Sequence, residues 1–183
     1  PVYLRRNQAD VLAELPPRIE IADWVRLDGP VAEVYRRSVA AGNFMAMRRA
    51  AFLTERPEES PKLVRLREIV DEAMANNRKV IVFSYFRDVI DRVMAELGPL
   101  ALGPLTGDVA PDDRQDLVDA FTAAPEPVVL VSQIEAGGVG LNIQAASVVI
   151  LAEPQWKPSV EEQAIARCHR MGQVRPVEVH RLL

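Results

Sequence analysis

The sequence has few of the residues that most directly mark a disulfide-bonded, metal-binding or membrane protein. Its 183 residues include one cysteine and two histidines. The single cysteine, Cys168, excludes an internal disulfide and fits a reducing compartment. His169 and His180 have no cysteine or carboxylate partners at ligand spacing, so the sequence predicts no metal site. No apolar run approaches membrane-spanning length, and no charged-then-apolar signal opens the chain, which predicts a cytoplasmic protein with no membrane partner.

What is present is ordinary for one soluble globular domain, with 49% apolar and 26% charged residues. The net charge of −4 argues against a broad nucleic-acid-binding surface. The charge is uneven, because residues 1–79 hold 14 basic and 12 acidic side chains, whereas residues 80–183 hold 8 and 14. Any nucleic-acid contact must therefore come from a few placed groups and backbone amides. Because the chain opens on Pro1, we expect it to be part of a longer protein.

Helical and strand patterns alternate along the chain with short connections, which predicts an α/β fold with a doubly wound parallel sheet. The expected strands are residues 79–84, 102–106, 127–131, 147–151 and 177–182. The expected helices are residues 8–15, 29–54 with a break near Gly42, 60–76, 86–97, 111–121 and 159–171. The polar run 54–61 contains two prolines and is the best linker, so we expect an N-terminal helical extension over 1–58 and the main lobe over 59–183.

The run from Glu161 to Gln173 contains two arginines that can act together. If it is helical, Arg167 and Arg170 share one face and can reach the same small anion. A planar, permanently charged guanidinium suits a phosphoryl group whose charge spreads in a transition state. The alternative is a solvated face on which these arginines pair with Glu161 and Glu162.

A second candidate is the glycine-rich segment after the strand that ends at Val131. Its three glycines within four positions, Gly137, Gly138 and Gly140, allow backbone amides to approach a phosphate closely. The alternative is a simple tight turn.

Both segments resemble motifs of one family. The run Gln-Ala-Ile-Ala-Arg-Cys-His-Arg-Met-Gly-Gln resembles motif six of the Swi/Snf-type ATPases, the double-stranded DNA translocases of helicase superfamily two. Ala-Gly-Gly-Val-Gly-Leu-Asn resembles motif five of the same family, and the Leu-Arg-Arg stretch near the N-terminus resembles its inter-lobe segment. The resemblance implies the second, C-terminal lobe of a RecA-like motor.

The resemblance also implies roles for particular residues. Arg167 and Arg170 would act as catalytic arginine fingers, and the nucleotide would lie against Gly137, Gly138, Gly140 and Gln163. The residues expected to contact DNA are Ser84, Arg114, Ser132, Asn142, Trp156 and Lys157. Two departures weaken the pattern near Arg114, because Asp108 and Val109 replace family hydroxyl residues. Simpler interpretations remain open: strand-end packing for Ser84, an ion pair with a neighbouring aspartate for Arg114, and a partly buried anchor for Trp156.

The sequence contains no Gly-x-x-x-x-Gly-Lys-[Ser/Thr] phosphate loop and no Asp-Glu-x-His acidic box. We therefore expect this chain to supply half of a site for ATP with Mg²⁺, with the metal held by an N-terminal lobe, and to be inactive alone. The expected partners are that lobe, double-stranded DNA and a nucleoprotein or polymerase substrate, with a nucleoid-associated location if the source is bacterial. The alternatives are a non-catalytic module that docks a protein partner and the lobe of an RNA helicase, which Gln173 disfavours.

Overall fold

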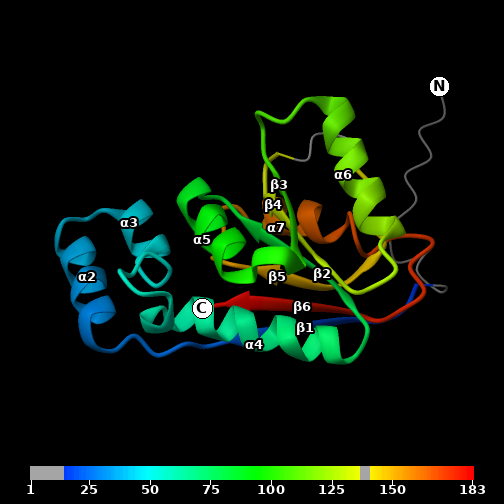
Figure 1. Ribbon diagram of the computed structural model, residues 1–183. Helices are drawn as coiled ribbons and strands as arrows, with labels where there is room; N and C mark the ends of the chain where they lie inside the picture. The colour runs from blue at the N-terminus through cyan, green and yellow to red at the C-terminus, as the bar shows by residue number, and fades with distance from the viewer. Residues whose placement is uncertain (1–14, 137–140) are drawn as a thin grey trace, which may run out of the picture.

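The computed structural model describes residues 15–136 and 141–183, which form a parallel sheet with helices on both faces (Figure 1). The sheet has six strands in the order β1-β6-β5-β2-β4-β3, and every pairing is parallel. The strands are β1 (Arg18–Asp23), β2 (Lys79–Ser84), β3 (Ala101–Leu105), β4 (Val129–Gln133), β5 (Ala146–Leu151) and β6 (Val177–Leu182). The predicted α/β fold with a doubly wound parallel sheet is confirmed.

Most of the helices begin at a capping side chain or a proline. They are α2 (Gly29–Ala40), α3 (Phe44–Arg49), α4 (Pro61–Ala75), α5 (Arg87–Leu97), α6 (Pro111–Ala123) and α7 (Pro158–Ile165), with short 3₁₀ turns at Pro57–Glu59 and Gly98–Leu100. At the start of α4, the Ser60 hydroxyl accepts the Leu63 N–H at 3.1 Å, and Pro61 occupies the first turn, where no N–H is needed. Likewise, the Asn43 side chain accepts the Ala46 N–H at the start of α3.

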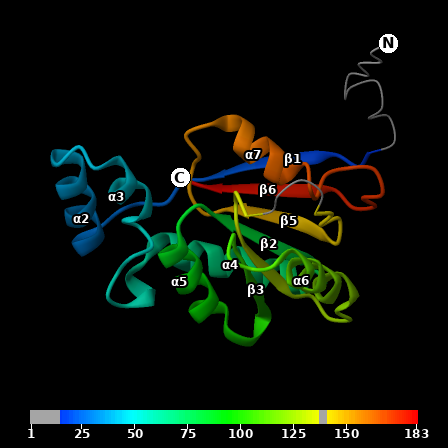
Figure 2. The same ribbon diagram turned by 90° about the horizontal axis from the view of Figure 1, so that it is seen from above.

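Helices cover both faces of the sheet (Figure 2), and each face carries its own hydrophobic core. On one face, α4 and α5 pack on alternate residues of the central strands, such as Val80 and Val82 of β2. On the other face, α6 and α7 pack on the intervening residues, such as Ile81 and Phe83. A strand buried on both faces reads as a continuous apolar run, which explains why β2 was predicted with its observed bounds.

Strand β1 is not among the predicted strands, because the sequence predicts only an inter-lobe segment and a helical extension over residues 1–58. It pairs with β6 along its whole length, from Arg18 opposite Val177 to Asp23 opposite Leu182. Charged and apolar residues alternate along β1, which is typical of a surface segment. The reason is that β1 lies at the edge of the sheet, where one of its sides has no partner strand in the described residues. The sheet therefore begins well before residue 59, and the predicted boundary at residue 58 divides it. The expected helix over 8–15 falls almost entirely in residues 1–14, outside the described residues.

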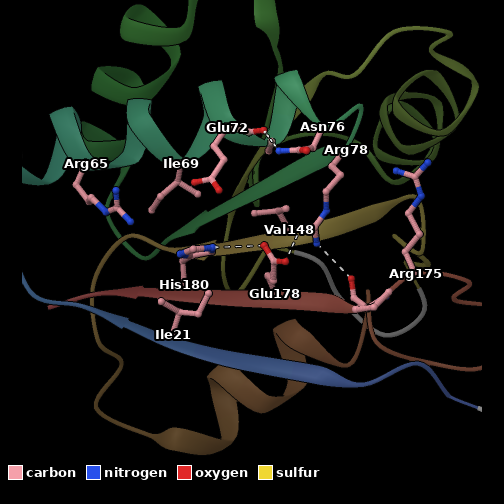
Figure 3. A pocket seen from close by; sticks show the side chains of 12 residues that line it. Ile21, Arg65, Ile69, Glu72, Asn76, Arg78, Val148, Arg175, Glu178 and His180 are labelled. Atoms are coloured by element: carbon pink, nitrogen blue, oxygen red, sulfur yellow. Dashed lines mark hydrogen bonds and ion pairs between the residues drawn. The ribbon is translucent and has the colours of Figure 1, made fainter.

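Beside α4, the outer strands β1 and β6 form the floor of a groove of about 700 Å³ (Figure 3). Glu178 and His180 of β6 project into it, and Arg78 pairs with Glu178 at 2.6 Å. At the end of β1, the buried Asp23 carboxylate accepts hydrogen bonds from Arg65 of α4 at 2.8 and 2.9 Å and contacts His180 Nδ1 at 2.8 Å. This carboxylate fastens the edge strand to both of its neighbours. None of the predicted site residues that the structure describes lines the groove.

We expect Asp23→Ala to lower the free energy of unfolding by about 3 kcal/mol, because it leaves a buried part of the Arg65 and His180 network without its acceptor. Glu68→Ala is the matched control, since Glu68 accepts from the same Arg65 side chain but at the surface, and should cost about 1 kcal/mol or less. Urea unfolding of both variants measures the difference. Equal losses would contradict the fastening role of Asp23.

Candidate nucleotide and nucleic-acid site

The two candidate arginines lie beyond the end of α7 and not on it. The helix ends at Ile165, and residues 166–170 form turns. Short-range hydrogen bonds from the Arg167 and Cys168 N–H groups to the carbonyls of Ala164 and Ile165 tighten the last turn. The prediction of a helix through residue 171, with both arginines on one helical face, is therefore wrong.

Arg167 is half-buried, and burial lowers the pKa of its guanidinium. Its Nη1 atom is buried and has no hydrogen-bond partner among the described residues. A buried donor without an acceptor is rare in a folded protein and is expected to be satisfied by a bound group. Arg170, three residues on, is exposed.

The alternative ion pairs with Glu161 and Glu162 do not form. Glu161 pairs with Arg181 at 2.8 Å, and Glu162 pairs with Arg18 at 2.7 Å. Both acids therefore fasten α7 to the outer strands β6 and β1, which sequence reasoning could not foresee because β1 was not recognised. Arg167 and Arg170, in the turn over residues 166–170 that is here called the arginine turn, therefore form no ion pair with either of these carboxylates.

The arginine turn lies against the segment that follows the glycines. The Ile143 N–H donates to the Arg167 carbonyl at 3.0 Å, and the Gln144 side chain donates to the Met171 carbonyl. The expected nucleotide-binding glycines, Gly137, Gly138 and Gly140, lie outside the described residues. Of the other candidates nearby, Gln163 is exposed on α7, and Asn142 is exposed with its amide 3.1 Å from the Gln144 side chain.

Several other residues of the motif hold this turn in shape. The buried Gln173 amide donates to the carbonyls of Gln144, Ala146 and Cys168 at 3.0 to 3.2 Å. Gly172 has a φ of +98°, and a side chain there would meet Gln144 at 3.0 Å. Burial raises the pKa of the Cys168 thiol to about 12, which makes it unreactive. The motif therefore combines a structural scaffold with the two arginines.

Two of the expected DNA contacts, Ser84 and Ser132, are buried at the carboxyl ends of β2 and β4, with 1% and 0% of their surface exposed. The Ser84 hydroxyl donates to Glu153 and accepts the Phe86 N–H, and the Ser132 hydroxyl donates to the Gln133 carbonyl at 3.1 Å. A DNA contact through either hydroxyl is incompatible with this conformation. The alternative for Ser84, strand-end packing, describes what the structure shows.

The Arg114 guanidinium is also occupied within the protein. It donates to the backbone carbonyls of Gly107, Val109 and Ala136 at 2.7 to 3.1 Å. Neither a phosphate contact nor the predicted aspartate pair describes this arrangement. The side chain ties the loop after β3 to the loop after β4.

Trp156 and Lys157 lie in the loop between β5 and α7, and both are exposed, Trp156 by 77%. The indole contacts the Phe44 ring edge to face, with ring centroids 5.3 Å apart. The neighbouring Gln155 fixes the loop, because its N–H donates to Glu161 at 2.8 Å and its side-chain oxygen accepts from Arg48 at 3.0 Å. Trp156 is thus a supported, solvent-exposed ring and not the partly buried anchor that the alternative described.

Sequence reasoning missed two buried ionisable residues, Glu153 and Lys62. Glu153 is fully buried and accepts hydrogen bonds from Ser84 and the Tyr85 N–H, and burial raises the pKa of its carboxyl to about 7. Burial likewise lowers the pKa of Lys62 to about 8, and its ammonium donates to the Leu182 carbonyl at 2.7 Å. The sequence signal for such a site is a single glutamate, Glu153, close behind the apolar run of β5.

Both the sequence and the fold of the chain match those of known proteins. The profile of the helicase conserved C-terminal domain matches residues 61–172. The chain belongs to this helicase C-terminal domain family. An uncharacterized ATP-dependent helicase of Mycoplasma pneumoniae is 32% identical over 207 residues, covering 100% of this chain and 20% of that protein. The chromatin-remodeling ATPase INO80 of Debaryomyces hansenii is 36% identical over 128 residues, covering 68% of this chain and 9% of that protein.

Solved structures share the fold of this helicase C-terminal domain. The C-terminal part of the Fun30 ATPase domain superposes with a TM-score of 0.81 at 19% identity, covering 93% of this chain and 86% of that one. The Sulfolobus solfataricus SWI2/SNF2 ATPase core in complex with dsDNA superposes at 0.76 with 24% identity, covering 98% and 44%. The predicted resemblance to the second lobe of Swi/Snf-type ATPases is confirmed. The chain spans about a fifth of the length of the first curated relatives.

The described residues contain no helix of the length and hydropathy that a membrane span requires. Within the same residues, no three His, Cys, Asp or Glu side chains are grouped to hold a metal ion.

The raised pKa of Glu153 predicts a pH-dependent stability. Because the folded state holds this proton more tightly than the unfolded state, the stabilisation is complete below about pH 4.5 and is lost as the pH rises through about 7. Glu153→Gln removes the titration and keeps an acceptor for the Tyr85 N–H. We expect it to gain about 3 kcal/mol relative to the wild-type protein between pH 4.5 and pH 8.

Urea unfolding at several pH values measures this difference. Glu126→Gln is the control, since it makes the same substitution at an exposed side chain. If the difference in free energy of unfolding between the wild-type protein and Glu153→Gln does not vary with pH, burial does not perturb the Glu153 carboxyl.

Proposed function

We propose that this chain is the second motor lobe of an ATP-dependent double-stranded DNA translocase or remodelling ATPase of the Swi/Snf type. The observation that carries the proposal is the half-buried Arg167, whose Nη1 atom lacks a partner among the described residues, beside Ile143 at the end of the glycine-rich segment. A fixed cation that lacks an acceptor is the group that an arginine finger requires.

On the nucleotide side, this lobe supplies positive charge and a backbone surface. Arg167 and Arg170 act on the γ-phosphoryl group, and Gly137, Gly138, Gly140 and Gln163 bind the rest of the nucleotide. The guanidinium donors fit ATP, which supplies the transferable phosphoryl group when it is bound with Mg²⁺. Holding Arg167 in a tight turn fixes its charge before the reaction begins, so little reorganisation is needed when charge develops on the phosphoryl oxygens.

On the DNA side, the exposed groups are Trp156, Lys157 and Asn142. Lys157 provides a cation for a backbone phosphate, and Trp156 provides an aromatic face next to it. The buried Ser84 and Ser132 act indirectly, since Ser84 donates to Glu153, which precedes the Trp156 loop, and Ser132 lies at the end of β4. A structural relative that is a SWI2/SNF2 ATPase core in complex with dsDNA supports duplex DNA as the partner.

The helix α7 connects the two sides. It begins directly after Lys157 and ends two residues before Arg167, a span of about 12 Å for eight residues. Movement of the DNA-contacting loop can therefore be transmitted through one short, rigid helix to the arginine turn. We infer that lobe closure on ATP and movement along DNA are coupled through α7.

The other requirements of the reaction belong to other parts of the protein. An N-terminal RecA-like lobe supplies the phosphate loop and holds Mg²⁺, so the isolated chain does not hydrolyse ATP. A nucleoprotein or DNA-bound polymerase is the expected substrate of the whole motor. We expect a cytoplasmic location, on the nucleoid if the source is bacterial.

We expect Arg167→Ala in the two-lobed protein to lower DNA-stimulated ATP hydrolysis by three to five orders of magnitude, with Arg170→Ala having a similar effect. Nucleotide binding should remain within about tenfold of the wild-type affinity, since the fingers act mainly on transition-state charge. Steady-state hydrolysis and nucleotide titration measure the two effects. The control is Arg56→Ala, an exposed arginine in a surface ion pair with Glu59. Near-normal turnover of either finger variant would refute the assignment.

We expect Lys157→Gln to weaken binding of duplex DNA and to reduce the dependence of log K on log salt by about one unit, because one phosphate contact is lost. Fluorescence anisotropy of a labelled duplex at several salt concentrations measures this slope. Arg56→Ala again serves as the control, and an unchanged slope in Lys157→Gln would remove Lys157 from the DNA interface.

A further inference from the structure

Beyond the carboxyl ends of β1 and β6 the structure has a pocket of about 340 Å³, here called the extension pocket. The end of β6 lies toward α2 and α3 in both views (Figures 1 and 2). The residues of its lining that carry its chemistry are Trp24, Leu27, Tyr35, Phe44, Arg48 and Lys62. None of the predicted nucleotide-binding or DNA-binding residues that the structure describes lines it. The pocket is therefore a feature separate from the proposed motor site.

A buried ammonium group lines the pocket. Lys62, in the first turn of α4, is 7% exposed. Its Nζ donates to the Leu182 carbonyl at 2.7 Å and lies 6.0 Å from the centroid of the Phe52 ring. An ammonium has three N–H donors, and the described residues provide this one hydrogen-bond acceptor. The other two donors can therefore bond to an occupant of the pocket.

Arg48 is a second cation in the lining that lacks an acceptor. Its guanidinium donates to the Gln155 side chain at 3.0 Å, but its Nε is buried and has no hydrogen-bond partner among the described residues. Buried donors without acceptors are rare in folded proteins, and each calls for an explanation such as a bound group. Arg48 and Lys62 thus both have unused donors at the same pocket.

The charges at the pocket favour an anionic occupant. The lining contains no Asp or Glu, and neither Arg48 nor Lys62 forms an ion pair within the described residues. The buried Glu153 carboxylate interacts with both cations, but it does not line the pocket, and burial favours its protonated form. One carboxylate for two cations leaves a positive charge that an anion can neutralise.

The other walls are apolar and open to solvent. Trp24 is 81% exposed, Phe44 45% and Tyr35 37%. On α2, Val39 stands one turn after Tyr35 and is 48% exposed, so the apolar surface continues from the pocket along the helix. A pocket that opens onto an apolar helix face is typical of a surface that binds a segment of another protein.

We propose that the extension pocket binds a segment of a partner protein in which an acidic residue adjoins a bulky apolar one. The apolar side chain packs against the exposed rings, and the carboxylate accepts hydrogen bonds from Lys62 and Arg48. A carboxylate on a flexible side chain can reach an ammonium that is 7% exposed, whereas a phosphate of a stiff duplex backbone cannot. The inference goes beyond the proposed function, since it uses neither the arginine turn nor the Trp156 loop.

Fluorescence anisotropy of labelled peptides, measured on the two-lobed protein, tests the proposal. The probe is the hexapeptide Asp-Glu-Phe-Leu-Asp-Glu. One control, Asn-Gln-Phe-Leu-Asn-Gln, lacks the charges, and the other, Asp-Glu-Ser-Ser-Asp-Glu, lacks the apolar groups. We expect the probe to bind at least about tenfold more tightly than either control, because each control loses one half of the recognition.

Lys62→Met removes the ammonium and keeps an apolar side chain, so it should weaken probe binding about tenfold or more. Lys79→Met is the matched control. The Lys79 ammonium also donates to backbone carbonyls, at 2.8 Å, and lies 5.7 Å from the Phe121 ring, but it is outside the pocket. This control should stay within about twofold of the wild-type affinity, and urea unfolding checks that both variants are folded.

Trp24→Ala should weaken probe binding about threefold to tenfold, because it removes an exposed apolar wall of the pocket. Since the indole is mostly exposed, the fold should tolerate this change. Val174→Ala is the control, because Val174 is 85% exposed and lies outside the pocket. It should leave the affinity within about twofold of the wild-type value.

Binding of duplex DNA separates this inference from the proposed function. Lys62→Met should leave the salt dependence of duplex binding unchanged, and Lys157→Gln should leave probe binding unchanged. Displacement of the probe by duplex DNA, or loss of probe binding in Lys157→Gln, would assign the pocket to the DNA interface and overturn the inference.

Four other results would also overturn it. The first is no saturable binding of the probe, as expected if another part of the same protein covers the pocket. The second is equal affinity for the probe and either control peptide. The third is an equal loss in Lys62→Met and Lys79→Met, or in Trp24→Ala and Val174→Ala. The fourth is binding of 3-phenylpropionate as tight as that of the probe, which would identify a site for a small carboxylate.

Discussion

The structure depends on the burial of the central strands β2, β4 and β5 on both faces. Val80, Ile81, Val82 and Phe83 are all fully buried, so each face of the sheet must be covered by helices. Parallel pairing then requires crossover connections, and the carboxyl ends of the strands meet along one edge. The loop that carries Trp156 follows β5 and therefore lies at this edge as a consequence of how the core is buried.

The connection from β4 to β5 takes the chain across β2, since β2 lies between these two strands in the sheet. The same segment ends beside the arginine turn, where Ile143 donates to the Arg167 carbonyl. The end of this connection is therefore held against the turn that carries the two arginines. Gln173, which looked like a mark of the family alone, is the residue whose amide holds this arrangement together.

Charged residues that appear similar in the sequence have different roles in the structure. Glu161 and Glu162 fasten α7 to the outer strands, Arg48 supports aromatic rings, and Arg114 bonds to backbone carbonyls. Arg18, Arg48 and Arg167 each have a buried guanidinium nitrogen without an acceptor in the described part of the chain, but Arg18 and Arg48 bond to Glu162 and Gln155 through their other nitrogens. A functional assignment in this domain therefore depends on which charged groups the fold leaves without a partner.

The sequence by itself determined the α/β class, most strands and helix starts, and the family, because apolar runs, caps and short motifs are local properties of the chain. Only the tertiary structure decided that β1 joins the sheet, that α7 stops at Ile165, and that Ser84 and Ser132 are buried. Each of these depends on partners distant in sequence: β6 for β1, Gln144 and Ile143 for the turn after α7, and Glu153 for Ser84. Local patterns cannot encode such contacts, since the same residues remain exposed until the sheet brings their partners together.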